Sequence, residues 1–519
     1  MDRPLPRPPE TVPDDPGHVP CAVVPNDRKD TNVRQAAPEL SQAQRLAVGE
    51  LLRVSPIADD LATRFAEAGF TLVLVGGSVR DALLGRLGND LDFTTDARPE
   101  DVLRLVRPWA DAVWDVGIAF GTVGCRKSAP SGGDAAGRRE YQLEITTYRS
   151  EAYDRDSRKP EVVYGDSLEE DLRRRDFTVN AMGVALPQKE FVDPHHGLAD
   201  LAQRVLRTPG TPEESFSDDP LRMLRAARFA AQLGFTVSEP VREAMTGMAE
   251  RIDIVSAERV RDELNKLLLS PHPRQGITLL VETGLADRVV PEIPALRLER
   301  DEHHRHKDVY EHSLTVLEQA IDLEEGQPDL VLRLAALLHD IGKPKTRRFE
   351  GDGRVSFHHH EIVGAKLTKQ RMARLKYPNE LIKDVSRLVE LHLRFHGYGT
   401  GEWTDSAVRR YVRDAGPLLE RLHKLTRSDC TTRNKRKAQA LSRAYDSLEE
   451  RIERLKQQEE LDAIRPDLNG NDVMEILGLP PGPDVGRAYR FLLELRLEKG
   501  PLGREAAEAA LKEWWAEQG

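Results

Sequence analysis

The stretch that most constrains how this chain can fold is residues 72–95, which read LVLVGGSVRDALLGRLGNDLDFTT. It opens with a short apolar run typical of a buried strand. Gly76 and Gly77 follow, where the backbone can turn sharply and come close to a ligand. Ser78 is predicted to cap the next helix, and Arg80 lies in the first turn of that helix. A helix N-terminus beside an arginine is a favourable place for a phosphate group.

Two carboxylates lie further along this stretch, at Asp90 and Asp92 on either side of Leu91. If this segment is a strand, both point to one face, because side chains alternate along a strand. A carboxylate pair next to a phosphate pocket suits a divalent metal held between protein and triphosphate. A glycine turn before a helix, or a pair of aspartates on a strand, is more often structural when it occurs alone. Together they favour nucleotidyl or phosphoryl transfer.

Chain length, net charge and cysteine content limit the class of protein. A chain of 519 residues is too long for one core, and a net charge of -11 argues against a generally basic nucleic-acid coat. A local basic groove remains compatible with that charge. Cys21, Cys125 and Cys430 are scattered, which predicts no disulfide framework and fits a reducing compartment. Without a long apolar stretch or a signal core, we expect a cytoplasmic protein without membrane contact.

Proline and charge dominate residues 1–40, which predicts disorder. Helices are expected from residue 41 to Gly69 and over residues 98–110, and strands over 113–125 and 141–149. In the last of these, Glu144 shares a face with Gln142 and is a candidate third carboxylate beside the Asp pair. An exposed strand glutamate is an equally good interpretation.

Arginines recur in two later segments. A helix over residues 167–175 ends in three arginines, including Arg175, and runs into Asp176 and Asn180. Such a run is usually a solvated face, but side chains that can hydrogen-bond a ribose follow it, which favours a nucleotide contact. The sequence SDDPLRMLRAARFAAQLGF then predicts a helix starting near Pro220.

On this helix the arginines recur every third residue, which places Arg222, Arg225 and Arg228 in one stripe. Asp219 lies at the N-terminal end of the same helix. A stripe of arginines is solvated more often than not. An aspartate and an arginine one turn apart can also present an acceptor and donors to the edge of a base.

A second group of polar residues lies at the ends of apolar helical segments further along the chain. Its members are His312, His339, Asp340, His360, His392 and Asp429. A single buried histidine is usually a core residue, but residues from several separate segments favour a metal site in a helical bundle. The basic segment 421–437 could follow a phosphate backbone, although an exposed helix face is the default interpretation. Beyond residue 468 the pattern is helix, turn and helix.

Several motifs together resemble a known family. The sequences LVGGSVRDALLG with DLDFTT, RRDFTVNAM, and DPLRMLRAARFAAQLGF are similar to bacterial CCA-adding tRNA nucleotidyltransferases of class II, in the tRNA nucleotidyltransferase/poly(A) polymerase family, of actinobacterial type with an HD domain. The resemblance implies an α+β head, a polymerase-beta-type mixed sheet with helices, followed by a mostly α-helical body that includes an HD-type domain. The implied division is a head at 41–185, a helical neck at 186–295, an HD-type domain at 296–440 and an RNA-contacting tail at 441–519.

The resemblance also implies roles for residues of this sequence. Asp90 and Asp92 would hold magnesium ions, and nucleotide binding would fall to a larger set: Gly76, Gly77, Arg80, Arg175, Asp176, Asn180, Asp219, Arg222 and Arg225. Within that set, Asp219 and Arg222 would present a template-like edge to CTP or ATP. One departure is Asp218, where the family pattern has glutamate. In the HD-type segment His312, His339, Asp340 and Asp429 would bind a divalent transition metal, and His360 and His392 would serve a second ion.

The function implied is template-independent addition or repair of the 3'-terminal CCA of tRNA from CTP and ATP. The head motifs do not distinguish it from a poly(A) polymerase that adds AMP to RNA 3' ends. A second alternative is an HD phosphohydrolase acting on nucleotide or tRNA-end phosphates, as the main or an additional activity. A third is a catalytically silent RNA-binding protein, which the full set of carboxylates and arginines disfavours.

Overall fold

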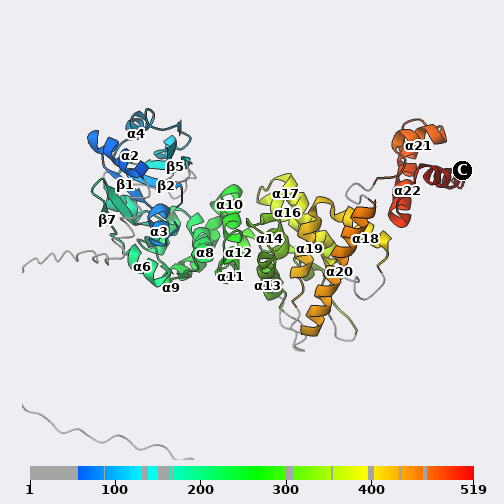
Figure 1. The fold of residues 1–519 in the computed structure, drawn as a ribbon. Coiled ribbons are helices and arrows are strands. Elements are labelled where there is room, and N and C mark those ends of the chain that lie inside the picture. Colours follow the sequence, from blue (N-terminus) through cyan, green and yellow to red (C-terminus); the bar gives the residue numbers. More distant parts are fainter. Residues whose placement is uncertain are drawn as a thin grey trace, which may run out of the picture. The chain divides into compact units, whose positions relative to one another are not determined.

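The computed structural model describes residues 56–86, 88–130, 138–149, 164–165, 167–297, 308–351, 355–395, 403–431, 435–459 and 465–518. The segment predicted to be disordered, residues 1–40, lies outside these ranges, as do residues 41–55 of the first expected helix. An α+β head is followed by helices, which confirms the predicted fold class (Figure 1). None of the helices in the described ranges has the length and apolar character needed to cross a membrane.

The head is built on a seven-stranded sheet of order β3-β4-β5-β2-β1-β6-β7. Its strands are β1 Leu72–Val75, β2 Asp90–Thr95, β3 Ala112–Trp114, β4 Thr122–Pro130, β5 Arg138–Thr147, β6 Gly183–Leu186 and β7 Glu190–Val192. Neighbours are antiparallel except β2 and β5, which run parallel. The sheet is therefore mixed, as the resemblance implied, and β1 and β2 fall on the two halves of the opening motif.

The two faces of this sheet differ sharply in burial. One face is a core, in which residues paired across four strands are buried: Leu74, Phe93, Ile145 and Val123. Helix α2 (Pro56–Glu67) contacts β1, and α4 (Pro99–Val106) contacts β4 and β5. On the other face, α5 (Leu168–Arg173) packs Leu172 against Val73 and Val75 of β1. The polar side chains of β2, β5 and β4 lie on the same face as Val73.

Helix α3 (Gly77–Leu83) follows the glycine turn, but Ser78 does not cap it. The N-cap is Gly76, which has a φ of 72°. Ser78 lies in the first turn, where its hydroxyl donates to the carbonyl of Asp90 (3.1 Å) and accepts from the N–H of Asp92 (3.0 Å). The predicted cap was wrong because this serine instead ties α3 to β2, a contact between residues distant in sequence.

After β7 the described chain is almost entirely helical. The next helices are α6 Gly197–Gln203, α7 Pro212–Asp218, α8 Leu221–Leu233, α9 Glu239–Gly247, α10 Ala257–Leu268, α11 Pro273–Glu282 and α12 Leu285–Val289, with a small pair of strands, β8 Val205–Leu206 and β9 Thr236–Val237. Helix α8 has Pro220 at its N-cap position, as predicted. The expected solvation of its arginine stripe is wrong for Arg228, which is buried and pairs with Glu263 of α10 at 2.6 Å.

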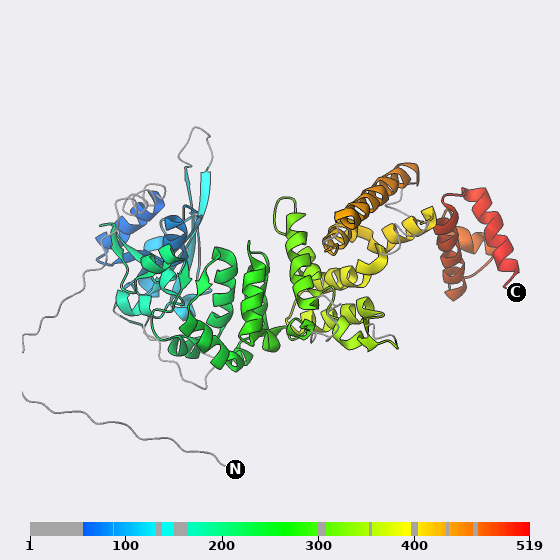
Figure 2. The ribbon, with the colours of Figure 1, turned by 90° about the horizontal axis from the view of Figure 1, so that it is seen from below.

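The next group of helices contains α13 Val309–Asp322, α14 Leu330–Leu338, α15 Lys343–Thr346, α16 His360–Arg374, α17 Asn379–Leu391, α18 Asp405–Ala415, α19 Leu419–Ser428 and the long α20 Lys435–Glu459, with a short hairpin of β10 Arg348–Phe349 and β11 Val355–Ser356. Figure 2 shows α20 in orange along its length. Buried Arg333 of α14 pairs with Glu324 and donates to the carbonyls of Leu268 and Ser270. This arginine thereby joins these helices to α10.

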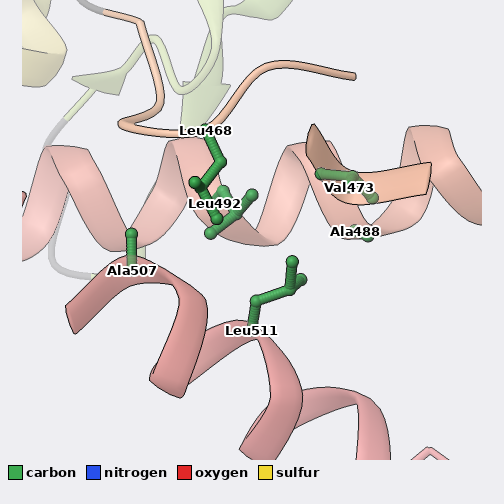
Figure 3. Packing of buried hydrophobic residues seen from close by; sticks show 6 residues of the cluster. All are labelled: Leu468, Val473, Ala488, Leu492, Ala507 and Leu511. Carbon is green, nitrogen blue, oxygen red and sulfur yellow. The ribbon is translucent and has the colours of Figure 1, made fainter. Parts of the chain in front are cut away.

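The last helices are α21 Gly470–Leu477, α22 Pro483–Lys499 and α23 Arg504–Ala516, which confirms the predicted helix, turn and helix and adds a third helix. They share a small apolar core, shown in Figure 3. Its buried members are Leu468, Val473, Ala488, Leu492, Ala507 and Leu511. Against this core Trp514 stacks on Phe491, with ring centroids 4.6 Å apart.

Candidate functional site

The sheet brings the three predicted head carboxylates together. Strands β2 and β5 are parallel in a register that pairs Asp90 with Gln142 and Asp92 with Glu144. Paired residues of neighbouring strands point to the same face, so Glu144 lies beside Asp92. Burial raises the pKa of Asp92, and the charge of Asp90 adds to this, while Arg175 opposes it. Burial likewise raises the pKa of Glu144, and the two aspartates add to it.

This cluster of three carboxylates fits a divalent cation. Within the described residues, the side chains of Asp90, Asp92 and Glu144 accept no hydrogen bond. The three repel one another, and hard oxygen ligands are those that ions such as Mg²⁺ prefer. Their oxygens do not gather within 4.8 Å of one another in the described chain. Other ligands, such as phosphate oxygens, would therefore complete the coordination.

Arginine lies on the β1 side of the carboxylates. A Cβ added to Gly76 would meet Arg175 Nη1 at 3.1 Å and Asp92 Oδ2 at 3.5 Å, so the glycine turn, Arg175 and the carboxylate form one small pocket. Gly77 starts α3 next to it, with Arg80 Nη2 3.5 Å from the corresponding position. Positive charge beside a metal site is the arrangement that a triphosphate needs.

One residue that holds this pocket was missed from the sequence. Asp171 is 1% exposed, and its carboxylate accepts hydrogen bonds from Arg174 and Arg175 at 3.2 Å and from Thr94 of β2. Burial disfavours the charged carboxylate, but the two arginines outweigh it and lower its pKa. The signal was present in SLEEDLRRR, because an acid three and four residues before arginines pairs with them on a helix.

The other predicted nucleotide-binding residues form a hydrogen-bonded network between the head and α8. Arg80 donates to the side-chain carbonyl of Asn180, the Asn180 amide donates to Asp176 (2.9 Å), and Arg225 donates to the other oxygen of Asp176 (2.8 Å). Asp176 is buried, which resists ionisation, but Arg225 and Asn180 hold its pKa well below its usual range. Phe229 lies among three guanidinium groups, those of Arg80, Arg225 and Arg228.

Asp219 and Arg222 lie together at the start of α8, where the N–H of Arg222 donates to the carbonyl of Asp219. Both side chains are half-buried and engaged by the protein. Arg259 donates to Asp219 (2.8 Å), and Arg222 donates to Ser215 (2.9 Å) and to the carbonyl of Arg174. Asp219 and Arg222 are thus held beside the arginines that follow α5.

In the helical body, the six predicted metal ligands gather as two adjacent triads. One contains His312, His339 and Asp429, and the other contains Asp340, His360 and His392; in each, the ligand atoms lie within 4.8 Å of one another. Within the first triad, His312 Nε2 is 2.8 Å from Asp429. The two triads are in contact, because His339 Nε2 of the first is 3.2 Å from Asp340 of the second. His358 and His359, which precede the ligand His360 in the chain, are exposed and line the cavity of about 660 Å³ at this site.

Each histidine of the triads is oriented by its other ring nitrogen. Nδ1 of His339, His360 and His392 lies 2.6–2.8 Å from the backbone carbonyl three residues earlier. Nδ1 of His312 contacts the hydroxyl of Thr431 at 3.1 Å. In that arrangement Nε2 faces the triads, and second contacts of this kind are typical of metal-binding histidines.

The donor chemistry of the triads also fits a metal. Nε2 of buried His392 has no hydrogen-bond partner in the described chain, and burial lowers the pKa of this histidine to about 3. Burial opposes charge on Asp429 as well, but His312 and His339 hold its pKa below its usual range. Neutral imidazole beside ionised carboxylate is the donor set that divalent metals bind.

Comparison with known proteins agrees with this geometry. The family model for the poly(A) polymerase head domain matches residues 72–207, a model described as a probable RNA and SrmB-binding site of polymerase A matches 234–296, and the HD domain model matches 309–434. An A-adding tRNA nucleotidyltransferase of Deinococcus radiodurans is 40% identical over 68% of this chain and 80% of its own length.

Two further relatives cover more of the chain. A CCA-adding enzyme of Streptococcus thermophilus is 34% identical over 82% of this chain and 88% of its own. A CC-adding tRNA nucleotidyltransferase of Thermus thermophilus is 32% identical over 85% and 93%. The solved CCA-adding enzyme of Bacillus stearothermophilus in complex with CTP has the same fold, with a TM-score of 0.63, 24% identity and coverage of 90% and 98%.

A carboxylate-bearing mixed sheet with adjoining arginines, followed by an HD domain, defines a nucleotidyltransferase of the polymerase-head class. Both kinds of domain imply dependence on divalent metal. The chain belongs to the tRNA nucleotidyltransferase/poly(A) polymerase family.

Proposed function

We propose that this protein adds or repairs the 3'-terminal CCA of tRNA from CTP and ATP. The observation that carries the proposal is the pairing of Asp92 with Glu144, beside Asp90 and against the pocket of Gly76 and Arg175. It supports attack by an RNA 3'-hydroxyl on the α-phosphate of a bound nucleotide, with release of pyrophosphate. Relatives that add nucleotides to tRNA support the substrate.

In the proposed reaction the carboxylates of Asp90 and Asp92 would hold Mg²⁺, which when bound would supply activation of the 3'-hydroxyl and neutralisation of the phosphates. Glu144 adds negative charge beside Asp92 and strengthens the hold on the cation. Arg175 neutralises the triphosphate, and Asp171 fixes that arginine. The protein contributes positioning and electrostatics, as is general for phosphoryl transfer.

Base choice is assigned to Asp219 and Arg222, which are adjacent at the start of α8. Arg222 carries donors, and Asp219 can accept from the exocyclic amino group of cytosine or adenine. Arg225 and Asp176 brace this helix against the head through their ion pair. The contacts with Arg259 and Ser215 hold Asp219 and Arg222 in place before a nucleotide arrives.

The two HD triads are proposed to bind divalent transition metal, because their donors are imidazole and carboxylate. The triads and the head carboxylates belong to different domains, so we expect nucleotide addition not to require the HD site. Hydrolysis of phosphate esters at tRNA ends is the second activity proposed for this site, and it can be tested with the same protein preparations.

The deciding experiment supplies a tRNA lacking CCA with CTP alone, ATP alone, and both. We expect two CMP additions with CTP and one further AMP with both. Addition of CMP only would make the protein a CC-adding enzyme, and addition of AMP only to a tRNA that already ends in CC would make it an A-adding enzyme. A long AMP tail on any RNA would contradict the proposal in favour of poly(A) synthesis. Asp92→Ala should abolish addition, and Asp340→Asn should not.

A further inference from the structure

Trp114 lies in line with the head carboxylates across the sheet. In the registers of the strands, Trp114 pairs with Gly124, Gly124 with Glu144, and Glu144 with Asp92. Directly paired residues point to the same face, so Trp114 shares the open face of the carboxylates. This alignment could not be predicted from the sequence, because β3 is a short strand and the four residues come from four different segments.

The indole occupies the space that a side chain at position 124 would need. A Cβ added at Gly124 would come within 1.9 Å of Trp114 Nε1 and 2.3 Å of Cε2, so only glycine leaves room for the ring. Neighbouring strands are about 4.8 Å apart. The ring therefore lies about one strand spacing from the backbone of Glu144 and about two from that of Asp92.

The Trp114 side chain is not part of the buried core. Trp114 is half-exposed, and its indole N–H has no hydrogen-bond partner in the part of the chain that the structure describes. Trp109, by contrast, is 4% exposed and its indole donates to Asp60. A partly exposed indole that lies against a glycine on the face of the carboxylates is a surface on which a planar ligand can stack.

The two sides of the carboxylates differ in chemistry. On the β1 side lie Gly76 and Arg175, suited to the triphosphate. On the β4 side lies Trp114, and the same face of β4 carries Arg126, two residues from Gly124, with an exposed side chain 3.6 Å from Glu140. Nucleotidyl transfer needs the nucleotide and the RNA end on opposite sides of the metal. The side with a flat aromatic ring and one cation suits a base and its phosphate.

We propose that Trp114 stacks on a base at the 3' end of the acceptor RNA and that Arg126 contacts a phosphate of the same strand. The inference rests on the proposed function and adds to it the part of the head that holds the RNA end. Trp114 is a positioning residue, since it aligns the 3'-hydroxyl with the carboxylates without touching the reacting atoms. Stacking on an aromatic ring accepts any base, so the surface can serve successive additions.

The test measures CMP addition to tRNA lacking CCA, with tRNA and CTP varied separately. For Trp114→Ala we expect KM for tRNA to rise about ten-fold, the effect of losing one stacked base, with KM for CTP unchanged. Trp114→Phe should recover most of the loss. Gly124→Ala should imitate Trp114→Ala, because its Cβ displaces the indole. Phe349→Ala, which removes an exposed aromatic ring from the helical body, is the control without effect.

Binding of fluorescently labelled tRNA without nucleotide separates this inference from the proposed function. Trp114→Ala should weaken binding, and Arg126→Ala should reduce the slope of log affinity against log salt by about one. Unchanged KM and affinity in Trp114→Ala would overturn the inference, as would an equal rise of KM for tRNA and CTP. A wild-type protein that binds tRNA through Trp114 but adds no nucleotide would refute the proposed function alone.

Discussion

At the scale of single residues, the glycine turn makes the sharpest prediction. Gly76 has a φ of 72°, and a Cβ added at this position would lie only 3.1 Å from Arg175 Nη1. Gly76→Ala should lower the free energy of unfolding by about 1–2 kcal/mol, because a residue with a Cβ disfavours a positive φ. It should also lower kcat/KM for CTP on the order of 100-fold by displacing the arginine. Gly69→Ala is the matched control, because its φ is 82° but nothing lies within 4 Å. It should lose similar stability and keep activity, measured by urea unfolding and CMP addition.

A second residue-scale prediction concerns Cys125, which is buried in the core face of the sheet. Burial raises the pKa of its thiol to about 12 from the ordinary 9.0. The folded state therefore keeps a proton that the unfolded state loses, and this contribution to stability is complete below pH 9 and falls as pH rises toward 12. Cys125→Ser should remove that part of the alkaline loss. In the native wild type, iodoacetamide at pH 8 should leave Cys125 unmodified, and rapid labelling detected by mass spectrometry would contradict this.

At the scale of elements, helix α8 is held to α10 by Arg228, which is 8% exposed and pairs with Glu263 at 2.6 Å. Glu263→Ala leaves a buried guanidinium without its partner and should destabilise the protein by about 3–5 kcal/mol. Glu282→Ala breaks the exposed pair with Arg242, 3.2 Å apart, and should cost less than about 1 kcal/mol. Urea midpoints at constant m-value measure both, and similar losses would show that burial does not set the strength of the Glu263 pair.

At the scale of the whole molecule, the head carboxylates and the HD triads should bind metal independently. Mn²⁺ at 100 times its dissociation constant should stabilise the HD domain by about 2.7 kcal/mol. The resulting rise in Tm should persist in Asp92→Ala and vanish in Asp340→Asn, because Asp340 contacts His360 of its own triad and His339 of the other triad. Loss of the rise in Asp92→Ala would mean that the two sites are coupled.

The local parts of the fold were predictable from sequence. Strand β1 and the glycine turn depend on residues close in the chain, and the structure confirms them. The errors at Ser78 and Arg228 have one cause. Their partners, β2 for the serine and Glu263 for the arginine, are distant in sequence, so tertiary contacts overrode the local preference. A periodicity argument has no access to such partners.

The candidate site follows the same division. The alternation of β2 and β5 was enough to put Asp92 and Glu144 on the polar faces of their strands, but only the parallel register makes them neighbours. The residue types of the HD segment predicted a metal site, and the resemblance implied a second ion at His360 and His392. That Asp340 groups with these two histidines depends on helix packing. Asp171 was within reach of sequence reasoning, and Trp114 was not, because Gly124 matters only once β3 and β4 pair.

The order of strands has a consequence for how the protein is made on the ribosome. β1 leaves the ribosome early, yet it lies between β2 and β6, and β6 follows the whole of β3, β4, β5 and α5 in the chain. A nascent chain that stops before β6 has an apolar strand with one open edge, which invites pairing with another chain. A chain that stops before β5 lacks Glu144. Translation pauses within this segment should therefore favour aggregation, whereas pauses in the helical body come after the head is complete.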